Sequence, residues 1–304
     1  MRIKPQAIIN SRLGVGLALG LARGLPPRTG YRVAYAVASW IAGHKDWDIV
    51  QAVRANQCIV SGDSFSEEQL DRAVQETFRN TAHCIYDLYH YIHNDAALWD
   101  LIDFSPASLE IIQKSQNREE GLIVVGMHSC SFDIVMQAAS LRGLQALVIT
   151  LPQLTRGYEW QTEMRARAGM EIVPASVASL HEAVHRLRNG GTVLTGLDRP
   201  LPGLKHRPRF FGRPASLPVH HVQLALKTKV PLVVASGLLR PGGRYSFLVS
   251  DPLHMRTHRD RETEILINAE AALKVAEEMI CQDPHQWAMF YPVWPELKQG
   301  ANWE

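Results

Sequence analysis

The chain has 304 residues, of which 46% are hydrophobic and 20% charged, with a formal net charge of +2. These values are ordinary for a globular protein with a substantial core, organised as one large domain or two small ones. Its four cysteines are far apart and form no CxxC pair. This spacing excludes a disulfide framework or a zinc ribbon and indicates reduced thiols in a cytoplasmic setting.

Positive charge is concentrated in two stretches that contain no Asp or Glu. The first, residues 1–45, carries Arg2, Lys4, Arg12, Arg23, Arg28, Arg32 and Lys45, and the second carries Arg199, Lys205, Arg207, Arg209 and Arg213. Such zones favour an anionic surface or a phosphorylated ligand as partner. No DNA- or RNA-binding motif accompanies them, so nucleic acid is not an expected partner.

The first basic stretch contains two short apolar segments, Val15–Ala22 and Val33–Ala42. Neither reaches the ~18–20 residues that a membrane-spanning helix needs, and the first is no clear signal peptide. Basic residues flank both, so we expect a pair of helices that lie on the surface of an anionic membrane. The alternative is that both are ordinary bundle helices packed on the domain.

Residues 1–100 have a helical pattern throughout. Within them, Ser66-x-x-Gln69 is a capping box that opens a long helix towards Ile92. From Gly121 onward, apolar strand-like runs alternate with helical segments, at Leu122–Met127, Ala146–Leu151, Glu171–Pro174, Thr192–Leu197, Leu232–Ser236 and Tyr245–Val249. The pattern predicts an α/β fold with a mainly parallel sheet flanked by helices. We expect a helical membrane-docking layer at 1–100 and an α/β core at 101–304, integrated in one domain.

The most informative segment is Gly121–Asp133, in which the apolar run ends at His128 and a carboxylate follows five positions later. Ser131 is a suitable N-cap for a helix over Phe132–Leu141. This places His128 at the carboxyl end of a buried strand and Asp133 in the first turn of the next helix, beside the crevice where α/β sheets bind ligands. A carboxylate on one imidazole nitrogen would allow the other to take a proton from a hydroxyl. A structural histidine that caps a carbonyl is the simpler alternative.

A second pattern, His181-Glu182-x-x-His185, matches the motif of zinc hydrolases. Two imidazoles on one helix face would bind zinc, and Glu182 would activate a water molecule. The third ligand is missing, because Arg188 replaces the glycine of the extended motif and no Glu occurs between Glu182 and Glu262. We therefore favour a solvated helix face and no metal, and keep a zinc-dependent hydrolase as the alternative function.

Several segments, in collinear order over nearly the whole chain, resemble the bacterial lipid A biosynthesis acyltransferase family, which includes phosphatidylinositol mannoside acyltransferases. They are Arg54-Ala-Asn56, Gly126-Met-His128-Ser-Cys-Ser-Phe-Asp133, Arg165-Ala-Arg167-Ala-Gly169, Gly190 to Arg199, Arg209-Phe-Phe211-Gly212 to Pro218, and Pro284-His-Gln286-Trp287 followed by Trp294. The chain departs from the family at Cys130-Ser131, where the family has Gly-Asn, and in its weak N-terminal anchor.

The resemblance implies transfer of a fatty acyl chain from an acyl carrier protein or coenzyme A thioester to a hydroxyl of a glycolipid or lysophospholipid. His128 would be the general base, oriented by Asp133, and amides near Ser131 would bind the oxyanion. Arg165 and Arg167 would bind an anionic head group, with Asp198, Arg199, Phe211 and Gly212 as further substrate-binding residues. No cofactor is implied, and the protein would be peripheral on the cytoplasmic face of the inner membrane. A non-catalytic lipid-binding module is a further alternative.

Overall fold

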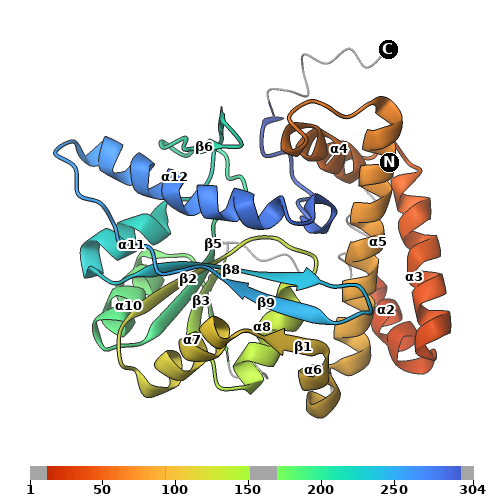
Figure 1. Ribbon diagram of the computed structural model, residues 1–304, viewed down its shortest axis with the longest axis horizontal. Coiled ribbons are helices and arrows are strands. Elements are labelled where there is room, and N and C mark those ends of the chain that lie inside the picture. The colour runs from red at the N-terminus through yellow and green to blue at the C-terminus, as the bar shows by residue number, and fades with distance from the viewer. Residues whose placement is uncertain (1–11, 93, 151–169, 296–304) are drawn as a thin grey trace.

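The computed structural model describes residues 12–92, 94–150 and 170–295, and its centre is a seven-stranded sheet in the order β1-β9-β8-β2-β5-β3-β4 (Figure 1). Strand β2 lies between β8 and β5 and runs parallel to both. The carboxyl ends of these three strands therefore lie at the same edge of the sheet. The strand bounds are β1 Ile102–Phe104, β2 Leu122–Gly126, β3 Ala146–Thr150, β4 Glu171–Pro174, β5 Thr192–Gly196, β8 Leu232–Leu239 and β9 Tyr245–Val249.

The predicted parallel sheet is confirmed for β8, β2, β5, β3 and β4. Strand β9 instead runs antiparallel to β8, and β1 pairs parallel to β9. The turn at 240–244, with Gly242 and Gly243 at positive φ, explains the reversal, because a hairpin turn joins antiparallel neighbours. Sequence patterns gave no sign of β1 or of the two-residue strands β6 (Arg209–Phe210) and β7 (Arg213–Pro214), which are too short for periodicity.

Alternate residues of each central strand enter two separate cores, as expected for strands buried on both faces. Ile123 and Val125 pack with helices α10 (Val177–Arg188), α11 (His220–Thr228) and α12 (Arg261–Ile280). Leu122 and Val124 pack on the opposite face with α7 (Pro106–Asn117) and α8 (Phe132–Leu141). Figure 1 shows α12 and α8 on opposite sides of the sheet.

In the described residues from 12 to 101, five helices precede the sheet, in agreement with the helical pattern of this part of the sequence. They are α2 (Arg12–Gly24), α3 (Pro27–Ala42), α4 (Asp48–Val60), α5 (Glu67–Tyr91) and α6 (Asp95–Leu101). Helix α5 lies between α3 and the sheet, and its residues contribute to the core around α8 (Figure 1). The proposed boundary near residue 100 stays a prediction.

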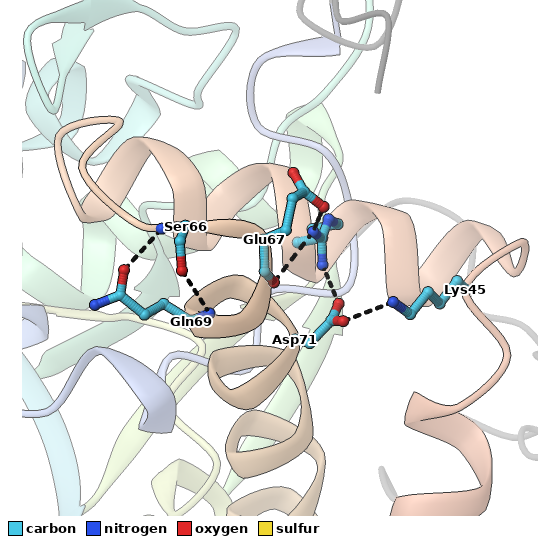
Figure 2. Close-up of polar contacts among 6 residues, drawn as sticks. Lys45, Ser66, Glu67, Gln69 and Asp71 are labelled. Carbon is cyan, nitrogen blue, oxygen red and sulfur yellow. Dashed lines mark hydrogen bonds and ion pairs between the residues drawn. The ribbon is translucent and has the colours of Figure 1, made fainter. Parts of the chain in front are cut away.

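The predicted capping box at the start of α5 is confirmed. Ser66 Oγ accepts from the Gln69 amide and Gln69 Oε1 accepts from the Ser66 amide (Figure 2). One turn further on, Asp71 accepts hydrogen bonds from Lys45 Nζ at 2.6 Å and from Arg54 Nη1 at 2.5 Å. These contacts join the start of α5 to α4 and to the end of the α3 segment.

A buried carboxylate fixes α3 and α5 to the sheet. Asp87 of α5 is fully buried and accepts hydrogen bonds from the hydroxyls of Tyr31 at 2.6 Å and Tyr245 at 2.5 Å. Tyr31 belongs to α3 and Tyr245 opens β9, so one side chain connects three elements. Burial and the bond to Asp87 raise the pKa of Tyr31 far above its ordinary value, which keeps this hydroxyl a donor.

Candidate active site

Two adjacent parallel strands, β2 and β5, end side by side with Gly126 opposite Gly196. His128 follows β2 by two residues and Asp198 follows β5 by two residues, so the register places both side chains at one edge of the sheet. His128 Nδ1 lies 2.6 Å from Asp198 Oδ1, and the His128 amide donates to Asp198 Oδ2 at 2.9 Å. The carboxylate thus binds both the backbone and the ring of the histidine.

The two members of this pair differ in burial. The Asp198 side chain is fully buried, whereas that of His128 is 40% exposed. Burial opposes ionisation of Asp198, but the charge and hydrogen bonds of His128 and a bond from Trp287 outweigh it and hold the Asp198 pKa below its ordinary value. An ionised Asp198 accepts a hydrogen bond from Nδ1–H, which fixes the tautomer with its lone pair on Nε2.

A C-terminal segment contacts both Asp198 and the loop that follows β2. Trp287 Nε1 donates to Asp198 Oδ2 at 2.8 Å, directly after the short 3₁₀ helix η1 (Pro284–Gln286). The backbone of this segment pairs with residues 127–131, the loop between β2 and α8 that contains His128 and is here called the histidine loop. The Cys130 amide donates to Gln286 O and the Ala288 amide to His128 O, both at 2.8 Å. Gln286 also bonds both backbone groups of Leu239 at the end of β8.

The segment is itself held by two buried side chains of α4. Asn56 Nδ2 donates to the carbonyls of Met289 and Tyr291, and its Oδ1 accepts from the Val293 amide. Gln57 Nε2 donates to the carbonyl of Pro284 at 2.7 Å. The N-terminal helices therefore position the C-terminal segment, which in turn positions the His128–Asp198 pair.

Trp287→Phe is expected to lower the free energy of unfolding by about 1–3 kcal/mol more than Trp294→Phe, because only the first change removes a donor from a buried carboxylate. The matched control is Trp294→Phe. Trp294 is equally buried, and its Nε1 has no partner among the atoms of the described chain, so this change loses the same indole volume without breaking a hydrogen bond. Urea unfolding of both variants measures the difference, and equal losses would contradict a special role for the Trp287 N–H group.

The structure changes the roles expected for Asp133 and Ser131. The carboxylate that binds Nδ1 of His128 is Asp198 rather than Asp133, which lies in the first turn of α8. Ser131 occupies the N-cap position, but its hydroxyl makes no cap bond, because its φ of −94° and ψ of 1° are not those of an extended N-cap residue. Two amides of the loop are already engaged, that of Cys130 with Gln286 O and that of Phe132 with Ser129 O.

The other expected binding residues are distributed unevenly. Arg199 follows Asp198, and its guanidinium lies 4.1 Å from the centre of the Tyr291 ring. Phe211 has a positive φ of 48° and its ring lies 6.2 Å from that of Trp287, whereas Gly212 is exposed on the β6–β7 turn. Arg165 and Arg167 lie outside the described residues.

Two of the five cations in the second basic stretch pair with acidic residues elsewhere in the chain. Lys205 pairs with Glu262 at 3.0 Å and Arg213 with Asp63 at 2.5 Å. The structure therefore does not present this stretch as a continuous free cationic surface. Within this stretch, Arg199 is the member that directly follows Asp198 in the sequence.

The histidines of the alternative zinc motif are exposed on α10. His185 Nε2 lies 3.2 Å from Asn189 Nδ2. Over residues 12–92, 94–150 and 170–295, no group of three or more His, Cys, Asp or Glu side chains is arranged to hold a metal ion. The third ligand that the sequence lacked is thus not supplied by the fold within these ranges.

Sequence reasoning did not assign roles to Trp287, Gln286, Asn56 and Gln57. The only signal for Asn56, Gln286 and Trp287 was membership of the motifs Arg54-Ala-Asn56 and Pro284-His-Gln286-Trp287, and Gln57 belonged to neither. Nothing in the spacing of residues that are more than 200 positions apart indicates that they meet.

The protein is an α/β protein with a mainly parallel sheet and a hydrogen-bonded histidine–aspartate pair at the carboxyl edge of that sheet. In this class of proteins, ligands bind at the carboxyl edge of the sheet. Within that class the family is shown by comparison, since the sequence model described as bacterial lipid A biosynthesis acyltransferase matches residues 4–296. The chain belongs to this family, whose activity is acyl transfer to lipid. Among individual curated proteins, none matches the chain.

Proposed function

We propose that the protein transfers a fatty acyl chain from a thioester to a hydroxyl of a glycolipid or lysophospholipid, with His128 as general base. The observation that carries this proposal is the 2.6 Å bond between His128 Nδ1 and a fully buried Asp198. Because Nδ1 is bonded to Asp198, Nε2 of the 40% exposed imidazole is left as the proton acceptor.

The proposed reaction needs no covalent acyl-enzyme. Nε2 of His128 takes the proton of the acceptor hydroxyl while the oxygen attacks the thioester carbonyl. The carbon–oxygen bond forms, the carbon–sulfur bond breaks, and the imidazolium returns its proton to the departing thiolate. Asp198 stabilises the positive imidazolium, and Trp287 and the His128 amide hold Asp198 in place.

Proposed substrate contacts follow from the residues beside the pair. Arg199 and Phe211 flank the Asp198–Trp287 contact, the first as a cation for a phosphate group and the second as an apolar wall for the acyl chain. Arg165 and Arg167 are proposed to bind the anionic head group, and Asp133 and Gly212 to contact substrate. The donor is an acyl carrier protein or coenzyme A thioester, and no cofactor is proposed.

The test is release of free thiol from a panel of acyl thioesters, measured with and without a membrane-lipid extract. Lipid-dependent release together with a labelled acyl chain in the lipid fraction supports acyl transfer. Release that is independent of lipid would indicate thioester hydrolysis and contradict the proposed reaction.

We further propose that the protein docks on the cytoplasmic face of the inner membrane through α3. Val33, Val37 and Trp40 are 36%, 50% and 60% exposed and recur at helical spacing, so they form one apolar stripe. Arg28 and Arg32 are exposed near the start of the same helix, and residues 1–45 contain no acidic side chain. An anionic bilayer complements both features. No helix in the described part of the chain is long and apolar enough to cross a membrane.

The double variant Val37→Ser/Trp40→Ser is expected to weaken binding to phosphatidylglycerol vesicles at least about tenfold. The reason is that burial of each side chain in the bilayer would contribute ~1.5–3 kcal/mol to the binding free energy. The matched control is Val177→Ser, which alters a 74% exposed valine on α10. Cosedimentation compares the variants. Unchanged vesicle binding, or a change in oligomeric state instead, would contradict a lipid-binding role for this stripe.

A further inference from the structure

Two cysteines that the proposed reaction does not use meet behind the histidine loop. Cys84 Sγ of α5 lies 3.1 Å from Cys130 Sγ, although the residues are 46 positions apart. Cys84 is buried and Cys130 is partly exposed, two residues after His128. Both are free thiols in the structure.

We propose that Cys84 and Cys130 form a redox-modification site, in which hydrogen peroxide converts them to an intramolecular disulfide that joins α5 to the loop of His128. The site goes beyond the proposed acyl transfer, and its formation does not depend on that activity.

The chemistry proceeds in two balanced steps. Cys130, the more exposed thiol, attacks one peroxide oxygen, the O–O bond breaks, and a sulfenic acid and one water molecule form. Cys84 then attacks the Cys130 sulfur, the S–O bond breaks, and hydroxide leaves as water with the Cys84 proton. Two thiols are oxidised, and the peroxide is reduced to two water molecules.

Geometry selects this pair over the other cysteines. Cys58 donates to Asp63 at 3.3 Å, and burial with this bond raises its pKa to about 11, which suppresses its thiolate. Cys281 is exposed beyond the end of α12, and no contact within the described residues joins it to another cysteine. Burial also keeps the Cys84 pKa high, so Cys84 is the resolving thiol and not the first to react.

Disulfide formation should disturb the site. The sulfurs must approach by about 1 Å to reach the ~2.05 Å of a disulfide bond. The Cys130 amide is bonded to Gln286 O and the His128 carbonyl accepts from Ala288, so a shift of the loop strains the contacts that position His128. A misplacement of this size at a reacting group can cost ~10²-fold in rate.

The experiment treats the full chain with hydrogen peroxide, blocks remaining thiols with iodoacetamide in urea, and maps the peptides by mass. We expect a dithiothreitol-sensitive peptide pair that links Cys84 to Cys130. The variant Cys58→Ser/Cys281→Ser should form it equally, and Cys84→Ser should not. Oxidation of Cys130 without this link, or a link to Cys58 or Cys281 instead, would overturn the proposal.

Activity provides the second measurement. The acyl-transfer rate of the disulfide-linked protein should be at least about tenfold lower than that of the reduced protein, and dithiothreitol should restore it. Peroxide-treated Cys84→Ser should not show a reversible loss. A linked protein with full activity would overturn the effect on the loop. If wild-type protein shows no acyl transfer at all, the proposed function fails, while the peptide map still decides whether the disulfide forms.

Discussion

Replacing His128 by alanine is expected to lower the rate of lipid-dependent thiol release by about 10²–10⁴-fold, the usual contribution of a general base. The loss should fall mainly on kcat, because the imidazole acts on the hydroxyl in the transition state. His128 is 40% exposed, so its removal leaves no large cavity and the protein should still fold. Circular dichroism and urea unfolding verify this before rates are compared.

The matched control is His181→Ala, which removes an exposed histidine on α10. Its activity should equal that of the wild-type protein. The pair of variants also separates the two candidate chemistries, because a zinc hydrolase would lose activity with His181 and not with His128. Full activity in His128→Ala would contradict the proposed base.

Asp198→Asn is expected to reduce kcat by about 10²–10⁴-fold, and Asp133→Asn by less than about tenfold. The asparagine amide would face two donors, the His128 backbone N–H and Trp287 Nε1–H, that both point at Asp198 Oδ2. It therefore cannot satisfy them and orient the ring at once. Because His128 and Asp198 act as a unit, the double variant His128→Ala/Asp198→Asn should be scarcely slower than His128→Ala alone.

The stability of the two aspartate variants tests the same assignment without an activity assay. The folded-state pKa of Asp198 is depressed by His128 and Trp287, so its stabilisation is present above the unfolded pKa of about 3.9 and is lost as the pH falls through the folded value. The difference in unfolding free energy between wild type and Asp198→Asn should thus be constant near neutral pH and shrink below about pH 4. A larger kcat loss in Asp133→Asn, with no such pH dependence for Asp198→Asn, would return the orienting role to Asp133.

Much of the fold could be predicted because its signals are local. Apolar runs such as Leu122–Met127 are buried on both faces whatever their neighbours, and a capping box such as Ser66–Gln69 is complete within one helical turn. The direction of β9 and β1 could not be predicted from the sequence in the same way. It depends on which strand each one pairs with, and β9 pairs antiparallel to β8 while β1 pairs parallel to β9.

The position of His128 could be predicted for the same local reason, since His128 lies two residues after the end of a buried strand. Its partner was assigned to Asp133, the carboxylate nearest in sequence, whereas the structure gives that bond to Asp198, 70 positions away. The spacing of residues along one loop cannot indicate which neighbouring strand ends beside it. The register of β2 against β5 decides that, and the long-range pairing of the C-terminal segment with Asn56 and Gln57 completes the site.

The sequence by itself determined the α/β pattern, the place of His128 at a strand end, and the motifs of an acyltransferase family, because each is written in contiguous residues or in their order. Only the tertiary structure decided which carboxylate and which tryptophan hold the histidine, and which two thiols lie together. These contacts join residues that are from 46 to 89 positions apart, and only the packed tertiary fold brings such residues within contact distance.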